Sequence, residues 1–302
     1  MKSYSFRIEP LDASFGAAVR GVRLGELDDE AFSELYDLWL EYGLLVCPEQ
    51  HLSREAQITL ASRFGPLEFE IAALSNVRKD GSIRADDGSD EVVQVLRGNM
   101  GWHHDSTYMP VQAKGAVFTA EVVPSRGGAT GFADMRAAYD ALDDATRSRI
   151  QDLRAHHSLY HSQAQIGHVG RPGTHPGRSV SGMGSEEGEG YSGYGFHDGP
   201  VSVRPLVKVH PETARKNLLI GRHAYDIVGL EPEESERLLD SLAAFACQPP
   251  RIYHHQWAPG DAVIWDNRRL MHRATPWPMH EPRIMWHSRI AGDPATEVAL
   301  TA

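Results

Sequence analysis

The chain has 302 residues, of which 41% are hydrophobic, and a formal net charge of -11 at pH 7. That apolar fraction supports a substantial core, and the length fits one large domain or two ordinary ones. The acidic excess argues against nucleic acid and against an anionic membrane as partners, but it allows a small anionic substrate in a local basic pocket. The N-terminus lacks an apolar signal core, and no run approaches about 18 apolar residues, so we expect a cytoplasmic protein without a membrane span.

Two cysteines, Cys47 and Cys247, each follow a short apolar run. Free cysteine is among the most buried residue types, so both are expected to be buried free thiols. Such thiols fit a reducing cytoplasm.

Short β-rich runs, bounded by glycine and proline, recur from one end of the chain to the other. Such runs predict strands, and a glycine-rich turn with a further short strand is expected over residues 127–134. The other expected strands lie at residues 4–9, 44–47, 92–96, 116–123, 206–209, 218–220, 252–254, 262–265 and 284–290.

Helices are expected between some of these strands. Asp28 and Ser53 are favourable N-cap residues, and Gly65 with Pro66 ends the helix that Ser53 begins. The clearest amphipathic pattern covers residues 231–247. Its inward-facing residues are expected to be Leu238, Leu239, Leu242, Phe245 and Ala246. The expected helices lie at residues 28–42, 53–64, 135–142, 143–153 and 231–247.

The order of these elements favours one fold class. The strands are many and short, and they do not alternate regularly with helices, so a doubly wound parallel sheet is disfavoured. We therefore expect a mainly β protein with flanking helices, a sandwich or jelly roll, that forms a single domain over residues 1–302. Residues 167–200 are rich in glycine, serine and proline, and a loop of that length is either a mobile lid over the site or a disordered insert.

The segment Gly-Trp-His-His-Asp-Ser-Thr-Tyr at residues 101–108 carries the first chemical signal. On an extended strand His103 and Asp105 point to the same face, so both can reach one metal ion, whereas His104 points away and is not expected to be a ligand. With 16 histidines and 41 acidic residues in the chain, chance alone places an acid two residues after a histidine about twice. The spacing does occur twice, but the second instance, His210-Pro211-Glu212, is typical of a turn.

Residues farther along the chain complete a possible site. His272 follows an Asp-Asn turn that can bring its side chain to the rim of a barrel, and two histidines with one carboxylate form the facial triad of non-haem Fe(II) oxygenases. Such an iron leaves positions for a chelating 2-oxo acid and for O2. Arg283, 11 residues after His272, is suited to the distant carboxylate of that acid, and the Thr130 hydroxyl can add a second contact.

The joint spacing of these residues resembles the taurine/2,4-D dioxygenase family. The shared pattern is His-x-Asp, a threonine in Gly-Gly-x-Thr 27 residues after His103, and a distal histidine followed 11 residues later by arginine. Four further segments are similar to the aryloxyalkanoate (phenoxypropionate) dioxygenase branch. They are GNMGWHHDSTYMP at 98–110, FADMRAAYDAL at 132–142, LIGRHA at 219–224 and MWHSR at 285–289.

This resemblance implies a double-stranded β-helix, or jelly roll, that uses Fe(II), 2-oxoglutarate and O2. It implies iron at His103, Asp105 and His272, and 2-oxoglutarate at Thr130, Trp257 and Arg283. The implied reaction hydroxylates the carbon beside the ether oxygen of a phenoxy acid, so that the ether separates into a phenol and a 2-oxo acid, with succinate and CO2. We also expect a homo-oligomer.

The chain departs from the family pattern where substrate is recognised. A basic residue often lies four positions after the co-substrate arginine, but here that residue is His287, with Arg289 two positions further on; a lysine of related herbicide-cleaving enzymes corresponds to Gln94, with Arg97 nearby. The candidates for binding the anionic group of the substrate are Arg222, His223, His287 and Arg289.

Three other functions remain open at this point. The same iron chemistry could act on a sulfonate, a sulfate ester or another small carboxylate. A zinc hydrolase could use the same three ligands, although no clear general base accompanies them. A binding protein without catalysis is disfavoured, because the full set of ligands is retained together with Thr130 and Arg283.

Overall fold

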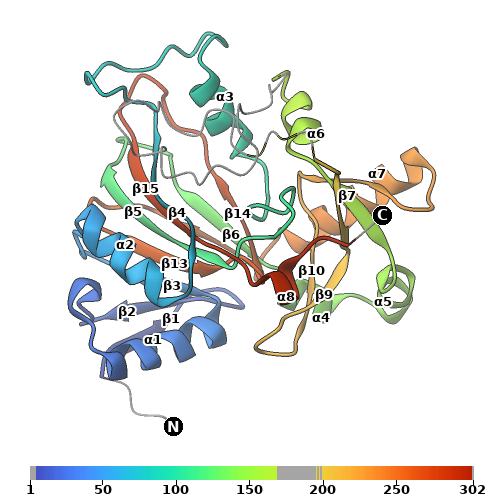
Figure 1. Ribbon diagram of the computed structural model, residues 1–302, viewed down its shortest axis with the longest axis horizontal. Coiled ribbons are helices and arrows are strands. Elements are labelled where there is room, and N and C mark those ends of the chain that lie inside the picture. The colour runs from blue at the N-terminus through green and yellow to red at the C-terminus, as the bar shows by residue number, and fades with distance from the viewer. Residues whose placement is uncertain (1–4, 169–194, 196, 198, 301–302) are drawn as a thin grey trace.

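The computed structural model describes residues 5–168, 195, 197 and 199–300, and Figure 1 shows their arrangement. The strands are β1 (Arg7–Pro10), β2 (Ala17–Arg20), β3 (Leu44–Cys47), β4 (Leu67–Ser75), β5 (Gly115–Val122), β6 (Thr130–Asp134), β7 (Arg154–His157), β8 (Ser202–Pro205), β9 (Val207–Val209), β10 (Lys216–Leu218), β11 (Ala224–Ile227), β12 (Ile252–His255), β13 (Ala262–Asp266), β14 (Leu270–Ala274) and β15 (Ile284–Ile290). The helices are α1 (Asp29–Tyr42), α2 (Arg54–Arg63), α3 (Glu91–Gly98), α4 (Met135–Ala141), α5 (Asp144–Ile150), α6 (Leu159–Ala164), α7 (Pro232–Ala246) and α8 (Pro294–Glu297), with a 3-10 turn at Leu24–Glu26.

Two sheets form the centre of the molecule. The larger has the strand order β1-β2-β3-β13-β5-β15-β4, and the smaller has the order β12-β6-β14. All pairings in these two sheets are antiparallel apart from the pairing of β2 with β3. The described strands also form two further sheets, β11-β7-β8 and β10-β9.

Alternation along the strands separates two apolar layers. In β3, Leu45 and Cys47 pack with α1 and α2 on the outer face of the large sheet, whereas Leu44 and Val46 join Phe132 of the small sheet. Successive side chains of a strand point to opposite faces, so one short apolar run serves both layers. On the far side of the small sheet, α4 and α7 cover a third cluster, and α1 and α2 flank the large sheet in Figure 1.

The same alternation directs polar residues into the space between the sheets. Residues two apart in a strand share one face. His272 in β14 therefore shares a face with Leu270, and Thr130 in β6 shares a face with Phe132; both Leu270 and Phe132 belong to the core between the sheets. In β15, His287 likewise shares a face with Met285 of the same core. The two sheets therefore bring residues far apart in the sequence to one end of a shared interior.

Most predicted elements are present, and two predictions are wrong. Residues 92–96 form part of helix α3 rather than a strand, because the Asp90 side chain caps Val92 and Val93 and the apolar residues follow a helical spacing. The pair His103 and Asp105 does not lie on a regular strand: His103 forms an isolated bridge with His272, and Asp105 begins a turn. Helix α7 and the predicted capping by Asp28 and Ser53 are confirmed.

The structure also bears on the predictions for residues 167–200 and for the two cysteines. The lid or insert predicted at 167–200 lies almost entirely outside the described residues, and a single domain over residues 1–302 stays a prediction. Cys47 is a buried free thiol as predicted, whereas Cys247 is only partly buried, at the C-terminal end of α7. Within the described ranges, no helix combines the length and the apolar character that crossing a bilayer requires.

Candidate metal and co-substrate site

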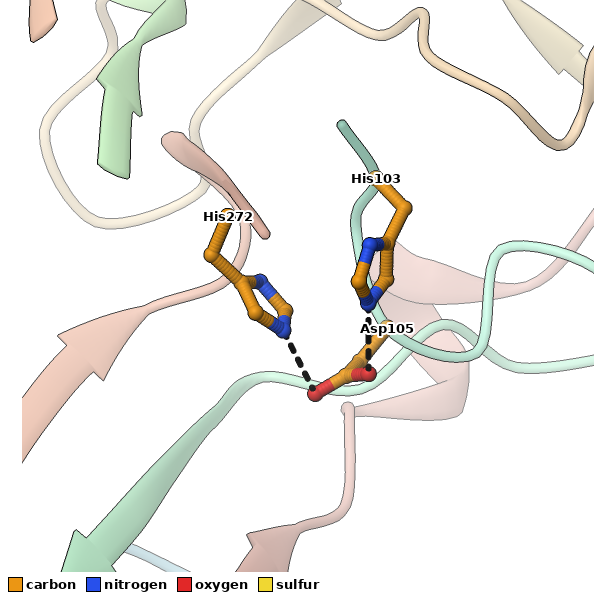
Figure 2. A group of neighbouring side chains, drawn as sticks. All are labelled: His103, Asp105 and His272. Carbon is orange, nitrogen blue, oxygen red and sulfur yellow. Dashed lines mark ion pairs between the residues drawn. The ribbon is translucent and has the colours of Figure 1, made fainter. Parts of the chain in front are cut away.

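His103, Asp105 and His272 converge, as Figure 2 shows. Their candidate ligand atoms all lie within 4.8 Å of one another. The Nε2 atom of His103 is 3.9 Å from one oxygen of Asp105, and the Nε2 atom of His272 is 3.7 Å from the other. Two imidazole nitrogens and one carboxylate that face a common point fit a non-haem Fe(II) ion with open coordination positions.

The backbone between these residues explains the convergence. His103 N–H donates to the carbonyl of His272 at 3.0 Å, and His272 N–H donates to that of His103 at 2.8 Å. This reciprocal pair holds the two imidazole rings 4.3 Å apart, centroid to centroid. The Nδ1 atom of His103 is 2.7 Å from the carbonyl of Gly101, and a proton donated there leaves the Nε2 lone pair for a metal.

The protonation states also suit a metal ion. Burial lowers the pKa of His103 to about 4 and that of His272 well below its ordinary value, so both rings are neutral at pH 7. Burial alone would raise the pKa of Asp105, but the nearby Arg289 charge opposes it and the pKa lies below its ordinary value. Neutral imidazoles and an ionised carboxylate are the ligand forms that a divalent cation needs.

His104 points away from this group, as predicted. Its Nδ1 atom lies 2.7 Å from the carbonyl of Asn267, and its side chain is not among the convergent ligand atoms. The ring is buried and its pKa is lowered to about 4 by burial. His104 therefore belongs to the packing behind the candidate metal site.

His103, Asp105 and His272 line a cavity, and Thr130 and Arg283 line it as well. Thr130 is the first residue of β6, and Arg283 directly precedes β15. The Nε1–H group of Trp257 donates to the Thr130 hydroxyl at 2.9 Å, so this tryptophan orients the threonine without lining the cavity. Arg283 is 3% exposed, and its Nε–H donates to the carbonyl of Gly128 at 3.2 Å. Gly128 permits this approach, because an added Cβ would lie 3.2 Å from the Arg283 Nε.

Arg283 is a buried cation without an acidic partner in the part of the chain that the structure describes. Burial lowers its pKa to about 10, which still leaves the guanidinium charged at pH 7. Among the described residues, no carboxylate lies within ion-pair distance of it. A buried cation of this kind is costly unless an anion pairs with it, and the arginine fork fits a carboxylate that enters the cavity.

The four residues predicted to bind substrate fall into different places. His223 and His287 line the cavity, and His287 stacks on Trp265 with ring centroids 5.5 Å apart. Arg289 also lines it, but its Nη2 atom is 2.9 Å from an Asp105 oxygen. Arg222 does not line it, since its Nη2–H donates to the carbonyl of Ser162 on α6 at 2.5 Å.

The cavity has an apolar wall that no sequence pattern singled out. It combines side chains of β4, α3 and α6 with aromatic residues from separate segments, and these side chains line the same cavity as the candidate ligands. These residues are Leu74, Val95, Leu96, Tyr108, Phe118, Leu159 and Trp277. Such a wall fits an aromatic or aliphatic group held beside the metal.

Comparison with known proteins supports this geometry. Residues 7–289 match the model of the family described as "Taurine catabolism dioxygenase TauD, TfdA family". The chain is 65% identical over 298 residues to an (S)-phenoxypropionate/alpha-ketoglutarate-dioxygenase of Sphingobium herbicidovorans, with 99% of each chain covered. A protein of the same description from Delftia acidovorans is 52% identical, with 98% of each chain covered.

A solved structure extends the match to three dimensions. The crystal structure of AAD-2 in complex with Mn(II) and N-oxalylglycine has a TM-score of 0.84 and 33% sequence identity, covering 99% of this chain and 100% of that one. The predicted jelly roll with flanking helices is therefore confirmed. The chain belongs to the taurine catabolism dioxygenase TauD, TfdA family.

Proposed function

We propose that this protein is an Fe(II)- and 2-oxoglutarate-dependent dioxygenase that cleaves the ether bond of aryloxyalkanoates such as (S)-2-phenoxypropionate. The observation that carries the proposal is one cavity that joins the three convergent candidate ligands to a buried arginine without an acidic partner among the described residues. The high identity to two phenoxypropionate dioxygenases supports the substrate class.

Different residues would bind the iron and the co-substrate. His103, Asp105 and His272 would hold the iron, and Arg283 would bind the distant carboxylate of 2-oxoglutarate with the Thr130 hydroxyl, which Trp257 orients. When bound, the iron supplies the O2 chemistry that converts 2-oxoglutarate to succinate and CO2 and inserts one oxygen into a substrate C–H bond. Hydroxylation beside the ether oxygen gives a hemiketal from phenoxypropionate, which collapses to a phenol and pyruvate.

The remaining side chains would aim that C–H bond and exclude water. The aryl ring fits the apolar wall built by α3, α6 and Trp277. The substrate carboxylate would meet His223 or His287, each of which can donate one N–H as a neutral ring, because burial holds the pKa of both well below the ordinary value. Direct contacts from Arg222 and Arg289 stay predictions.

A product panel tests the substrate class. Purified enzyme with Fe(II), ascorbate and 2-oxoglutarate is incubated with (S)- and (R)-2-phenoxypropionate, a short alkyl sulfonate and an alkyl sulfate ester. The proposal expects phenol and pyruvate from a phenoxypropionate as the dominant products. Sulfite from the sulfonate, or aldehyde from the sulfate ester, at a higher rate than phenol would assign the same chemistry to a different substrate.

Assembly and location remain separate predictions. A homo-oligomer is expected, and sedimentation of the purified protein would test it. A single species with the mass of one 302-residue chain would contradict that expectation. The cytoplasmic location likewise stays a prediction, which fractionation of cells that produce the protein would test.

A further inference from the structure

Asn267 lies in the turn between β13 and β14, and its side chain is fully buried. Its Oδ1 atom accepts a hydrogen bond from the backbone N–H of Asp105 at 2.7 Å, and its Nδ2 atom donates to the carbonyl of Asp105 at 3.0 Å. The same Nδ2 also donates to the carbonyl of Ala113 at 2.9 Å. A primary amide carries an acceptor and donors side by side, so this one side chain holds both polar backbone groups of a candidate metal ligand.

The backbone of Asn267 strengthens this attachment. Its carbonyl lies 2.7 Å from the Nδ1 atom of His104, and its N–H donates to the carbonyl of Lys114 at 3.0 Å. Asn267 thus contacts the segment that carries Asp105 and the segment that leads into β5. The attachment uses side chain and main chain at once, so it leaves the turn little freedom to shift against residue 105.

The chain beyond Asp105 turns sharply. Ser106 has a φ of +57°, a left-handed conformation that residues other than glycine seldom adopt. Such a conformation persists only where its surroundings hold it, and outliers of this kind cluster at functional sites. The two bonds from Asn267 hold the residue directly before this turn.

The segment from the β13–β14 turn through β14 therefore bears on all three candidate ligands, although β13 and β14 belong to different sheets. It supplies His272 itself, and the reciprocal bonds between His272 and His103 hold the second ligand. Asn267, five residues before His272, holds the third through the backbone of Asp105. A change at Asn267 would release one ligand while the other two remain paired.

We propose that Asn267 is a positioning residue that sets the place of the Asp105 carboxylate, and so the affinity of the site for a divalent metal. This inference rests on the proposed metal ligands. Residues that orient metal ligands from behind typically change metal affinity by about 10- to 100-fold when they are replaced. Asn267→Ala should therefore weaken binding of Mn(II) alone by about tenfold or more.

The chain offers a matched control in Asn76, which is also fully buried. Its Nδ2 atom donates to the carbonyls of Met279 and Glu281 at 2.8 and 2.9 Å, and its Oδ1 atom accepts from the backbone N–H of Arg283 at 2.8 Å. Asn76→Ala removes three side-chain hydrogen bonds, as Asn267→Ala does, and one of them is to the backbone of the co-substrate arginine. It should leave Mn(II) affinity within about twofold of the wild type.

The experiment measures Mn(II) binding to the full chain, without 2-oxoglutarate, from the electron paramagnetic resonance signal of free Mn(II). Wild type, Asn267→Ala, Asn76→Ala and His103→Ala are compared, and Asn267→Ser is the milder second variant, expected to fold with less loss of packing. Circular dichroism and a cooperative thermal melt establish that each variant is folded.

Each outcome has a distinct meaning. Weak binding by Asn267→Ala or Asn267→Ser, beside near-normal binding by Asn76→Ala, supports the inference. Normal binding by the Asn267 variants, or equal losses in the Asn267 and Asn76 variants, would overturn it. Equal binding by wild type and His103→Ala would instead refute the proposed metal ligands.

Discussion

Replacing Arg289 with glutamine breaks a buried ion pair with Asp105. The Arg289 Nη2 and an Asp105 oxygen are 2.9 Å apart, and the two side chains are 4% and 6% exposed. Removing one partner of such a pair typically costs about 3–5 kcal/mol, because the other charge stays buried without compensation. For a domain with a free energy of unfolding of about 5–15 kcal/mol, that loss is large.

A bound divalent cation should reduce the loss. In metal-free protein, Arg289 is the largest influence that lowers the pKa of Asp105 against burial, so Arg289→Gln leaves the carboxylate poorly stabilised. Mn(II) at the proposed site would supply positive charge to the same carboxylate. Arg289→Gln is therefore expected to lower the free energy of unfolding by about 3 kcal/mol in EDTA and by clearly less in saturating Mn(II).

Urea unfolding with and without Mn(II) measures both values, and Arg269→Gln is the matched control. Arg269 forms an equally buried pair with Asp134 at 2.7 Å, outside the candidate ligand group. Arg269→Gln should therefore lower the free energy of unfolding by a similar amount with and without metal. A loss below about 1 kcal/mol for Arg289→Gln, or a loss that Mn(II) does not reduce, would refute this reasoning. An unchanged stability with a raised KM for phenoxypropionate would favour direct substrate binding by Arg289.

Three further predictions address the co-substrate, the pH dependence of stability and the identity of the metal ligands. Because Arg283 is buried and charged without an acidic partner among the described residues, Arg283→Ala is expected to raise the KM for 2-oxoglutarate at least tenfold, with a much smaller change in the KM for phenoxypropionate. Equal changes in the two KM values in steady-state kinetics would count against that role. Burial lowers the pKa of His103 and of His104 from 6.5 to about 4. The stability that these neutral rings contribute to the metal-free protein is therefore complete above pH 6.5 and is lost as the pH falls toward 4, by roughly 3 kcal/mol for each ring at most. A free energy of unfolding that stays level from pH 6.5 to 4 in urea titrations would contradict the burial of neutral rings. His104→Gln should keep Mn(II) affinity within about threefold of the wild type while His103→Ala abolishes it, and a comparable loss in both would mean that His104 belongs to the metal site.

Much of the architecture could be predicted from local patterns. Alternation in short apolar runs such as Leu44–Cys47 predicts strands that serve two layers, and the inter-sheet core confirms that use. The spacing from His272 to Arg283 predicts that both residues face one interior, and His272 within β14 and Arg283 directly before β15 do line one cavity. These features depend on period and order along the chain, which a single sequence displays.

Other features depend on contacts that local patterns do not display. The run Val92–Leu96 is β-branched and favours a strand by composition, but the cap at Asp90 and burial of one face make it helical. The contact of Arg289 with Asp105 depends on β15, whose register with β4 shifts between His287 and Arg289. Asn267 resembles an ordinary turn residue until the fold brings Asp105 to its side chain.

The central claim is that metal, co-substrate and phenoxy acid react in one cavity. Its most direct test counts products per turnover when (S)-2-phenoxypropionate is added to wild-type enzyme with Fe(II), O2 and 2-oxoglutarate, beside His103→Ala under the same conditions. We expect one phenol for each succinate from the wild type and neither product above background from His103→Ala. Succinate formation that phenoxypropionate does not stimulate, or phenol release that continues without 2-oxoglutarate, would contradict the claim.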